Sequence, residues 1–297
     1  EAALKGVRLY ADSIDNSAGV DCSDHEVNIK ILIDKVVKAG GLTQKRREAL
    51  LASMTDEVGL QVLVDNYRQT QAINMILSQG MKVFDNQVRL MRMLEKAGRL
   101  NRTVEFLPDD EELVDRATAR VGLTGPEVAV LMSYAKIWVF DELKDSSLPD
   151  DVAFADELSA YFPTPLRKKY AKEINNHRLK REIIATLATN SIINRVGGTF
   201  ISRIVERTGM PVGDVVAAYV IARRVLDMRA VWERIDVLDN KIPASVQTNM
   251  RLDTNKLLEW VTLWFLRNGH RPLDIGSHVD EFADGFKELN ECLGTAL

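Results

Sequence analysis

The sequence is poor in cysteine. Its 297 residues include two, Cys22 and Cys292, which stand near opposite ends and form no C-x-x-C pair. Two distant cysteines give no disulfide framework and are typical of a protein from a reducing compartment. We therefore expect a cytoplasmic protein without structural disulfides.

Long apolar runs are also missing. No stretch reaches the roughly 18 apolar residues that cross a bilayer, and the start, EAALKGVRLYADS, lacks the charge and apolar order of a signal peptide. The charges nearly balance, with 39 Lys and Arg against 43 Asp and Glu and a net charge of −4. This composition predicts a soluble globular protein with no membrane contact, and nothing in it favours nucleic acid.

Strand patterns are almost absent. Only Gly6–Ala11, GVRLYA, alternates apolar and polar residues, and it leads into the turn DSIDNSAG. Proline is missing between Asp56 and Leu100, where apolar residues recur at helical spacing, so we expect one very long helix or two with a break near Gly80. From about residue 40 onward the patterns are helical.

Start and stop signals divide this helical part. Thr43 can cap one helix, and Pro108 and Gly122 can start and end another. Thr124 and Glu127 have the spacing of a capping box. The fold class that follows is mainly α: a multi-helix, bundle-like body after one short strand–turn–helix unit.

The stretch DNSAGVDCSDHE near the N-terminus gathers reactive side chains. Cys22, His25 and Glu26 stand at i, i+3 and i+4, which on a helix puts possible zinc ligands on one face. No second His or Cys pair lies nearby, so a metal site is the weaker interpretation. A Cys–His nucleophile pair is equally weak, because neighbouring helical positions seldom give the attack geometry. A helix start capped by Ser23 or Asp21 is the simpler interpretation.

The same stretch resembles a signature of the glutamate dehydrogenase family. There a strand leads into an Asn-Ala-Gly-Gly-Val turn near the end of the coenzyme-binding domain, and a Ser opens a long helix shortly afterwards. The residues that keep this register are Asn16, Gly19, Val20, Ser23 and Glu26. DNSAGVDCSDHEVNIKI is most similar to the very large NAD-specific members. Their helical C-terminal region also resembles SMTDEVGLQVLVDNYRQTQAI, LTGPEVAVLMSYAKIWVFDEL and SIINRVGGTFISRI.

This resemblance implies site residues and domain limits. It implies that Ser23 contacts the distal carboxylate of L-glutamate and that Asn16 lies near the nicotinamide of NAD. Residues 1–40 would be the C-terminal edge of the α/β coenzyme-binding part of a catalytic domain. Residues 41–297 would form a helical C-terminal domain that serves assembly or regulation in a homo-oligomer.

Catalysis is not expected of this chain alone. No strand is followed by G-x-G-x-x-G and a distal acid, so the dinucleotide-binding unit is incomplete. The catalytic lysines and aspartate of the family match nothing here. Because the first residue is Glu1 rather than Met, we expect an excerpt of a longer polypeptide, with upstream catalytic domains as its partners. The resemblance implies that the intact enzyme converts L-glutamate, NAD and water into 2-oxoglutarate, ammonium and NADH.

A free-standing helical interaction module, either an assembly scaffold or a DNA binder, is the alternative function. Residues 199–229 contain a helix, a short Gly-containing turn and a second helix, and they are locally basic. Apolar residues open the second helix, where base-reading side chains should project. Helix packing is therefore the stronger interpretation of this segment and DNA binding the weaker one.

Two further features concern packing. Trp260, Trp264 and Phe265 have the i, i+4, i+5 spacing of a buried stripe, which favours core over a ligand-stacking box. The polar break at Asn190–Asn194, followed by Gly197–Gly198, predicts either close helix packing or a buried hydrogen-bond network.

Overall fold

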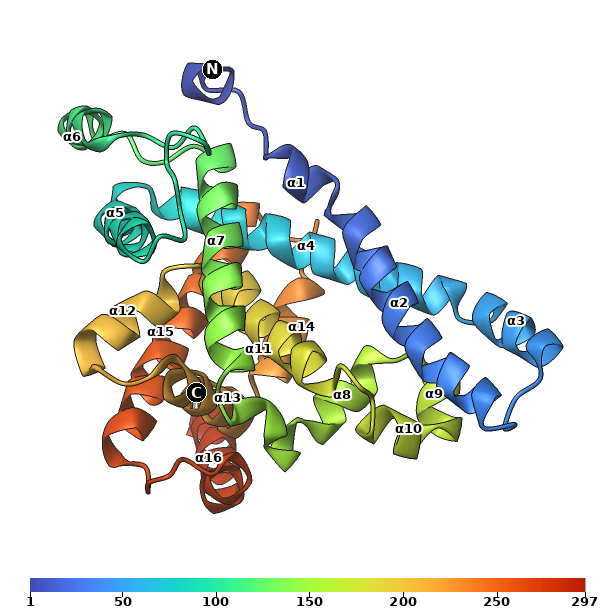
Figure 1. Cartoon of the computed structure of the whole chain (residues 1–297). Coiled ribbons are helices and arrows are strands. Elements are labelled where there is room, and N and C mark those ends of the chain that lie inside the picture. Colours follow the sequence, from blue (N-terminus) through green and yellow to red (C-terminus); the bar gives the residue numbers. More distant parts are fainter. Residues whose placement is uncertain (297) are drawn as a thin grey trace.

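All regular structure is helical in residues 1–296, the part of the chain that the computed structural model describes, with side-chain surroundings for residues 1–292 (Figure 1). The α-helices are α1 (Asp12–Asp15), α2 (Ser17–Lys38), α3 (Gln44–Ala52), α4 (Thr55–Gln79), α5 (Met81–Lys96), α6 (Asp110–Ala119), α7 (Gly125–Lys144), α8 (Ala155–Tyr161), α9 (Thr164–Lys169), α10 (Ala171–Asn175), α11 (Lys180–Val196), α12 (Phe200–Thr208), α13 (Val212–Val225), α14 (Met228–Asp236), α15 (Ala244–Asn268) and α16 (Ile275–Ala296). Short 3₁₀ turns are η1 (Ala3–Lys5), η2 (Leu148–Asp150) and η3 (Val152–Phe154). The predicted mainly-α fold class is confirmed.

Helix α13 lies at the centre of the carboxyl-terminal half. It is mostly apolar, and nearly all of it is buried, as expected for a helix without a continuous polar face. Helices α15 and α16 make the most extensive contacts with it, and α7, α12 and α14 pack around it as well. Helices α7 and α11 pack on each other and on α4, which in turn carries α2 (Figure 1). One continuous apolar core therefore joins α2 to the last helices. None of the described helices has the length and apolar character of a membrane span.

The long proline-free segment forms two helices. This confirms the second of the two predicted arrangements, in which a break lies near Gly80. Gly80 separates α4 from α5 with φ +51° and ψ −124°. Residues with a Cβ are strongly disfavoured at this positive φ, so a glycine is needed at this position. The break turns α5 out of the line of α4 and brings it beside α7 (Figure 1).

The capping signals are confirmed in two places and wrong in one. The Thr43 hydroxyl accepts from the backbone N–H of Arg46, and Thr124 forms the predicted capping box. Helix α6, however, begins after Asp109, whose carboxylate accepts from the backbone of the first turn, and it ends at Arg120 rather than Gly122. A side-chain cap satisfies an otherwise free N–H, which Pro108 cannot do.

The predicted strand at Gly6–Ala11 is wrong. Residues 7–11 form no regular structure, and the described chain contains no neighbouring strand, so no ladder of hydrogen bonds can form. The segment instead crosses the start of α7, where a Cβ on Gly125 would lie 2.4 Å from the Leu9 carbonyl oxygen. The Tyr10 hydroxyl donates to Asn74 Oδ1 at 3.1 Å. The expected strand–turn–helix unit is therefore a coil packed on α4 and α7 and followed by a helix.

Helix α2 begins earlier than predicted. Ser17 is its first residue, and its hydroxyl accepts from Asn66 Nδ2 at 2.8 Å and from Gln69 Nε2 at 3.3 Å. These bonds from α4 fix the start of α2 at the small-residue turn. Ser23 and Asp21 lie inside the helix, so neither is its N-cap.

Candidate functional site

Helix α2 has one buried and one exposed face. Its buried residues are His25, Asn28, Ile29, Leu32, Ile33 and Val36. On the other side, Asn16, Val20, Ser23 and Val27 are exposed. Steps of four, three and four residues place these positions on one line along a helix. The structure therefore brings the two predicted site residues, Asn16 and Ser23, onto the same exposed face.

Gly19 lies between these two residues in the sequence and is next to both side chains in the structure. The Ser23 hydroxyl donates to the Gly19 carbonyl oxygen at 3.1 Å. Asn16 makes no side-chain capping bond, and its Oδ1 would lie 3.3 Å from a Cβ on Gly19. The missing side chain at Gly19 leaves room for the amide above the helix, so an amide and a hydroxyl are available to a group on this face.

The possible metal ligands of the same stretch do not converge. Cys22 and Glu26 are exposed, whereas His25 is buried and stacks on the Tyr161 ring with centroids 4.4 Å apart. Within residues 1–296 no group of three or more His, Cys, Asp or Glu side chains is placed to hold a metal ion. Cys22 and His25 likewise point to different surroundings, so they do not form a nucleophile and its base.

Tyr161 of α8 instead ties α2 to the helical body. Its hydroxyl donates to Asp24 Oδ2 at 2.7 Å and accepts from Asn28 Nδ2 at 2.8 Å. Burial lowers the pKa of His25, which stacks on the same ring. This contact holds the middle of α2 in place behind its exposed face.

A polar network at the interface of three helices lies behind the start of α2. Asp21 comes from α2, Asp65 from α4 and Lys136 from α7. Lys136 Nζ donates to Gln69 Oε1 at 3.1 Å, and Gln69 Nε2 donates to Ser17. Asp21 Oδ2 is buried without a hydrogen-bond partner. Sequence reasoning missed this network, because its members belong to distant segments with no local spacing signal.

The pKa values of the three ionisable groups in this network are shifted in the direction that favours the uncharged form. Burial, reinforced by Asp65, raises the pKa of Asp21 to about 6. Burial likewise raises the pKa of Asp65, although Arg68 opposes the shift. Burial lowers the pKa of Lys136 to about 8, against the pull of the two carboxylates. Charge on these groups is therefore unfavourable in the folded state.

Replacing Asp21 by Asn is expected to stabilise the chain above about pH 6, by about 1–2 kcal/mol after allowing for solvent screening. The folded pKa of Asp21 exceeds its unfolded value of 3.8, so the wild type loses stability as the pH rises through about 6. The variant lacks this loss. Urea unfolding between about pH 4 and pH 7 measures the difference, and parallel pH curves for the two proteins would contradict the assignment.

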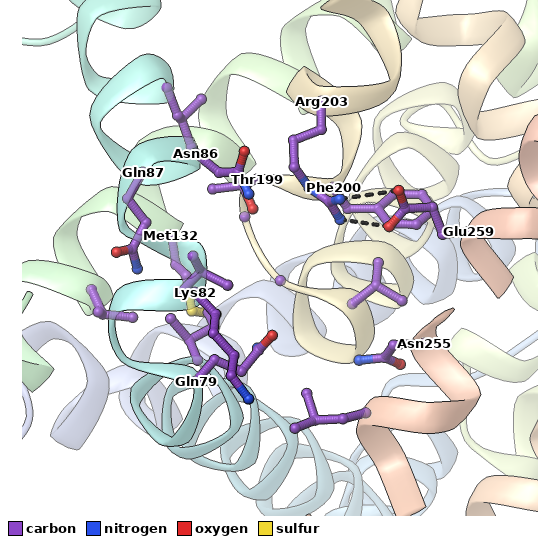
Figure 2. A pocket seen from close by; sticks show the side chains of 18 of the residues that line it. Gln79, Lys82, Asn86, Gln87, Met132, Thr199, Phe200, Arg203, Asn255 and Glu259 are labelled. Atoms are coloured by element: carbon purple, nitrogen blue, oxygen red, sulfur yellow. Dashed lines mark hydrogen bonds and ion pairs between the residues drawn. The ribbon is translucent and has the colours of Figure 1, made fainter. Parts of the chain in front are cut away.

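A cavity of about 550 Å³ lies farther along the body, between α5, α7, α12 and α15 (Figure 2). The Gly197–Gly198 turn forms part of its wall, and a Cβ on Gly198 would lie 3.3 Å from Ala135 Cβ. The glycine is thus needed for close packing of this turn on α7. The size is within the range of small-molecule pockets.

The charges of this cavity are largely paired. Arg203 forms two contacts with Glu259, at 3.0 and 2.8 Å (Figure 2), and Arg207 contacts the same carboxylate at 2.9 Å. Asn255 Nδ2 donates to the Arg195 carbonyl oxygen. No pair of nucleophile and base stands among its lining residues. The cavity offers polar surface for binding and no arrangement for catalysis.

The polar break before this turn is both close packing and a network. The Ser191 carbonyl accepts from the Tyr219 hydroxyl and the Ser191 hydroxyl accepts from Arg223, each at 3.0 Å. Asn194 is buried, and its Oδ1 has no hydrogen-bond partner. Both interpretations offered for this break therefore hold.

The helix-turn-helix-like segment is part of the core. Val215, Val216, Tyr219, Val220 and Ile221, which open α13, are all buried, so no base-reading side chain can project from them. Two of the basic residues in the segment, Arg223 and Arg224, contact the carboxylate of Glu157 in the same molecule rather than facing solvent. This arrangement argues against the DNA-binding alternative.

The aromatic prediction at α15 is wrong for two of its three residues. Phe265 is buried as expected, but Trp260 is 68% exposed and Trp264 is also exposed. Trp264 packs edge-on against Phe265 and Phe282. The spacing was compatible with a buried stripe, yet α15 turns this side away from α13.

Comparison with known proteins shows to which family the chain belongs. Residues 120–297 match the family described as glutamate dehydrogenase, C-terminal. The chain belongs to the glutamate dehydrogenase family. Residues 1–76, which include the exposed face of α2, match the catalytic domain of the bacterial NAD-glutamate dehydrogenases. The resemblance seen in the sequence is confirmed.

Three relatives are NAD-specific glutamate dehydrogenases. That of Halomonas elongata is 45% identical over 297 residues, covering 100% of this chain. That of Pseudomonas aeruginosa is 43% identical over 298 residues, covering 99% of the chain, and that of Mycobacterium tuberculosis is 38% identical over 289 residues, covering 97%. The chain spans only 18% of the length of each of them.

Proposed function

We propose that this chain is the C-terminal part of a cytoplasmic, homo-oligomeric NAD-specific glutamate dehydrogenase. The intact polypeptide would convert L-glutamate, NAD and water into 2-oxoglutarate, ammonium and NADH, and this chain by itself would be inactive. The observation that carries the proposal is the common exposed face of Asn16 and Ser23, in the segment that matches the catalytic domain.

We further propose that residues 1–40 form the edge of the catalytic domain and residues 41–297 the helical C-terminal domain. Exposed apolar side chains support a partner on this side, because Val20 and Val27 share the exposed face of α2 with Asn16 and Ser23. Apolar surface of this kind is suited to docking another domain. The upstream catalytic domains of the same polypeptide are the occupants that we assign to it.

In this proposal Ser23 binds the substrate and Asn16 binds the coenzyme. The hydroxyl of Ser23 is the donor for the distal carboxylate of L-glutamate, once it turns from the Gly19 carbonyl. The amide of Asn16, free of capping bonds, is the group that would meet NAD at the edge of its site. NAD accepts the hydride of the reaction. The described residues hold no parallel sheet, so the rest of the coenzyme site must come from elsewhere.

Replacing Ser23 by Ala in the full-length enzyme is expected to lower kcat/KM for L-glutamate about 10- to 100-fold. A hydrogen bond to a charged group contributes about 1.5–3 kcal/mol, and the alanine cannot donate. Initial rates of NADH formation would show the loss as a higher KM for glutamate at an unchanged KM for NAD.

The neighbouring exposed residue gives a matched control. Cys22→Ala removes a similar small side chain from α2 without touching the Asn16–Ser23 face, and it should retain the wild-type kinetics. Asn16→Ala should raise the KM for NAD instead. A Ser23→Ala enzyme with wild-type constants would refute the role of the hydroxyl, and an inactive wild-type polypeptide would refute the proposed reaction.

A further inference from the structure

Helix α15 has an apolar outer face. Its exposed large apolar residues are Val246, Met250, Leu257, Trp260 and Trp264. With the exposed Asp253, these positions follow one another at steps of four, three, four, three and four residues. Alternating steps of four and three are the heptad spacing of a helix that packs along its length on another helix.

The opposite face of α15 fixes the orientation of this stripe. Gln247, Arg251, Leu258, Thr262 and Phe265 are buried, where α15 makes its most extensive contacts with α13. The helix cannot roll to hide the outer residues without exposing these. Among the described residues, Phe282 of α16 partly covers Trp264 at the carboxyl end of this face, whereas Trp260 remains 68% exposed.

The size of the stripe is suited to a helix–helix contact. From Val246 to Trp264 it spans about 27 Å at 1.5 Å per residue. Tryptophan and methionine are enriched at protein interfaces, and exposed indoles in a row are uncommon on a surface that meets only water. The stripe therefore has the length and the composition of an interface.

We propose that this face pairs antiparallel with the same face of a second copy of the chain. The order of side-chain sizes supports this occupant. Small or flexible residues stand at the amino end of the stripe and the two indoles at the carboxyl end. A two-fold axis near Asn255 would put Val246 opposite Trp264, and Met250 opposite Trp260, so that each bulky ring meets a smaller side chain.

Charges near the midpoint complement each other under the same symmetry. Asp253 and Lys256 are both exposed, and Lys256 Nζ lies 2.9 Å from Asp253 Oδ1 in the same helix. In the antiparallel pair, Asp253 of each copy comes close to Lys256 of the other copy. A polar position within an apolar seam fixes the register of paired helices. This inference rests on the proposed role of the helical domain in assembly and assigns that role to a surface.

The first test is the oligomeric state of the full-length polypeptide with Trp260→Lys. A well-packed aromatic anchor of an interface contributes about 2 kcal/mol or more, so its loss should weaken self-association about 30-fold or more. Sedimentation equilibrium would show a lower weight-average mass at the same concentration. Phe106→Lys is the matched control, because Phe106 is 90% exposed outside α15 and its replacement adds the same charge.

The second test is an exchange of residues that is specific to antiparallel self-pairing. Met250→Trp would set two indoles against each other, and Trp260→Met would leave a gap. The double variant restores one indole opposite one methionine and should regain wild-type association. Trp260 is largely exposed, so the exchange leaves the core of the chain intact.

The outcomes separate the inference from the proposal on which it rests. Loss of association in Trp260→Lys alone, with recovery in the double variant, supports the antiparallel pair. An unchanged oligomer in Trp260→Lys overturns this surface but leaves assembly through another one. Loss without recovery shows that the face receives another segment of the polypeptide and overturns self-pairing. A wild-type enzyme that is monomeric overturns both.

Discussion

Replacing Glu157 by Gln is expected to lower the free energy of unfolding of the chain by about 3–5 kcal/mol. Glu157 of α8 accepts from three guanidinium groups, with contacts to Arg223 at 2.7 Å, Arg224 at 2.8 Å and Arg229 at 3.0 Å. The Arg223 side chain is only 6% exposed. Without the carboxylate, its positive charge would remain buried and unpaired. Urea unfolding followed by circular dichroism measures the change.

The pH dependence of the same interaction gives an internal check. Burial opposes ionisation of Glu157, but the neighbouring guanidiniums outweigh it and hold the pKa below the ordinary value of 4.5. Because the folded pKa is the lower one, the carboxylate stabilises the fold above about pH 4.5 and loses this effect as the pH falls through the folded value. The difference between wild type and variant should therefore shrink in acid.

The control for this variant is a glutamate outside any network. Glu142 of α7 is exposed, and Glu142→Gln should change the stability by less than about 0.5 kcal/mol. A similarly small effect of Glu157→Gln would mean that the three arginines find water or other acceptors, and the buried network would not hold α8 against α13.

Replacing Tyr219 by Ala should destabilise the chain by a comparable amount, about 3–5 kcal/mol. Tyr219 is completely buried in α13 and packs edge-on against Phe200 at a centroid distance of 5.8 Å. Its removal would leave a cavity at the centre of the core, where neighbouring helices cannot close in. The thermal or urea midpoint of the chain reports the loss.

The milder variant Tyr219→Phe separates packing from hydrogen bonding. It keeps the ring and removes only the hydroxyl, which donates to the Ser191 carbonyl oxygen at 3.0 Å. The expected cost is about 1 kcal/mol, the ordinary contribution of one hydrogen bond. Equal losses for the alanine and phenylalanine variants would contradict a role for ring packing.

The local features of the helical body were predictable from sequence. Thr43 and the Thr124–Glu127 box mark helix starts, because a side-chain oxygen satisfies a free backbone N–H wherever the helix lies in the fold. The break at Gly80 follows from the φ that only glycine tolerates easily. The family signature at Asn16–Ser23 was also recognisable, since it is a pattern of neighbouring residues.

The errors arose where a pattern depended on a neighbour. GVRLYA alternates like a strand, but a strand needs a partner, and the described residues offer it the start of α7 instead. Ser23 has the chemistry of a helix cap, yet α2 already begins at Ser17, because Asn66 and Gln69 from α4 bind the hydroxyl there.

The sequence by itself determined that this protein is helical, where α3 and α7 begin, where α4 breaks from α5, and which family it belongs to. These properties depend on backbone conformation and on residues close together in the chain. Only the tertiary structure decided which faces are covered: it buried α13, left Trp260 on the surface, and joined Asp21, Asp65 and Lys136 from three helices. Burial and long-range charge are set by the packing of distant segments, and no local spacing encodes them.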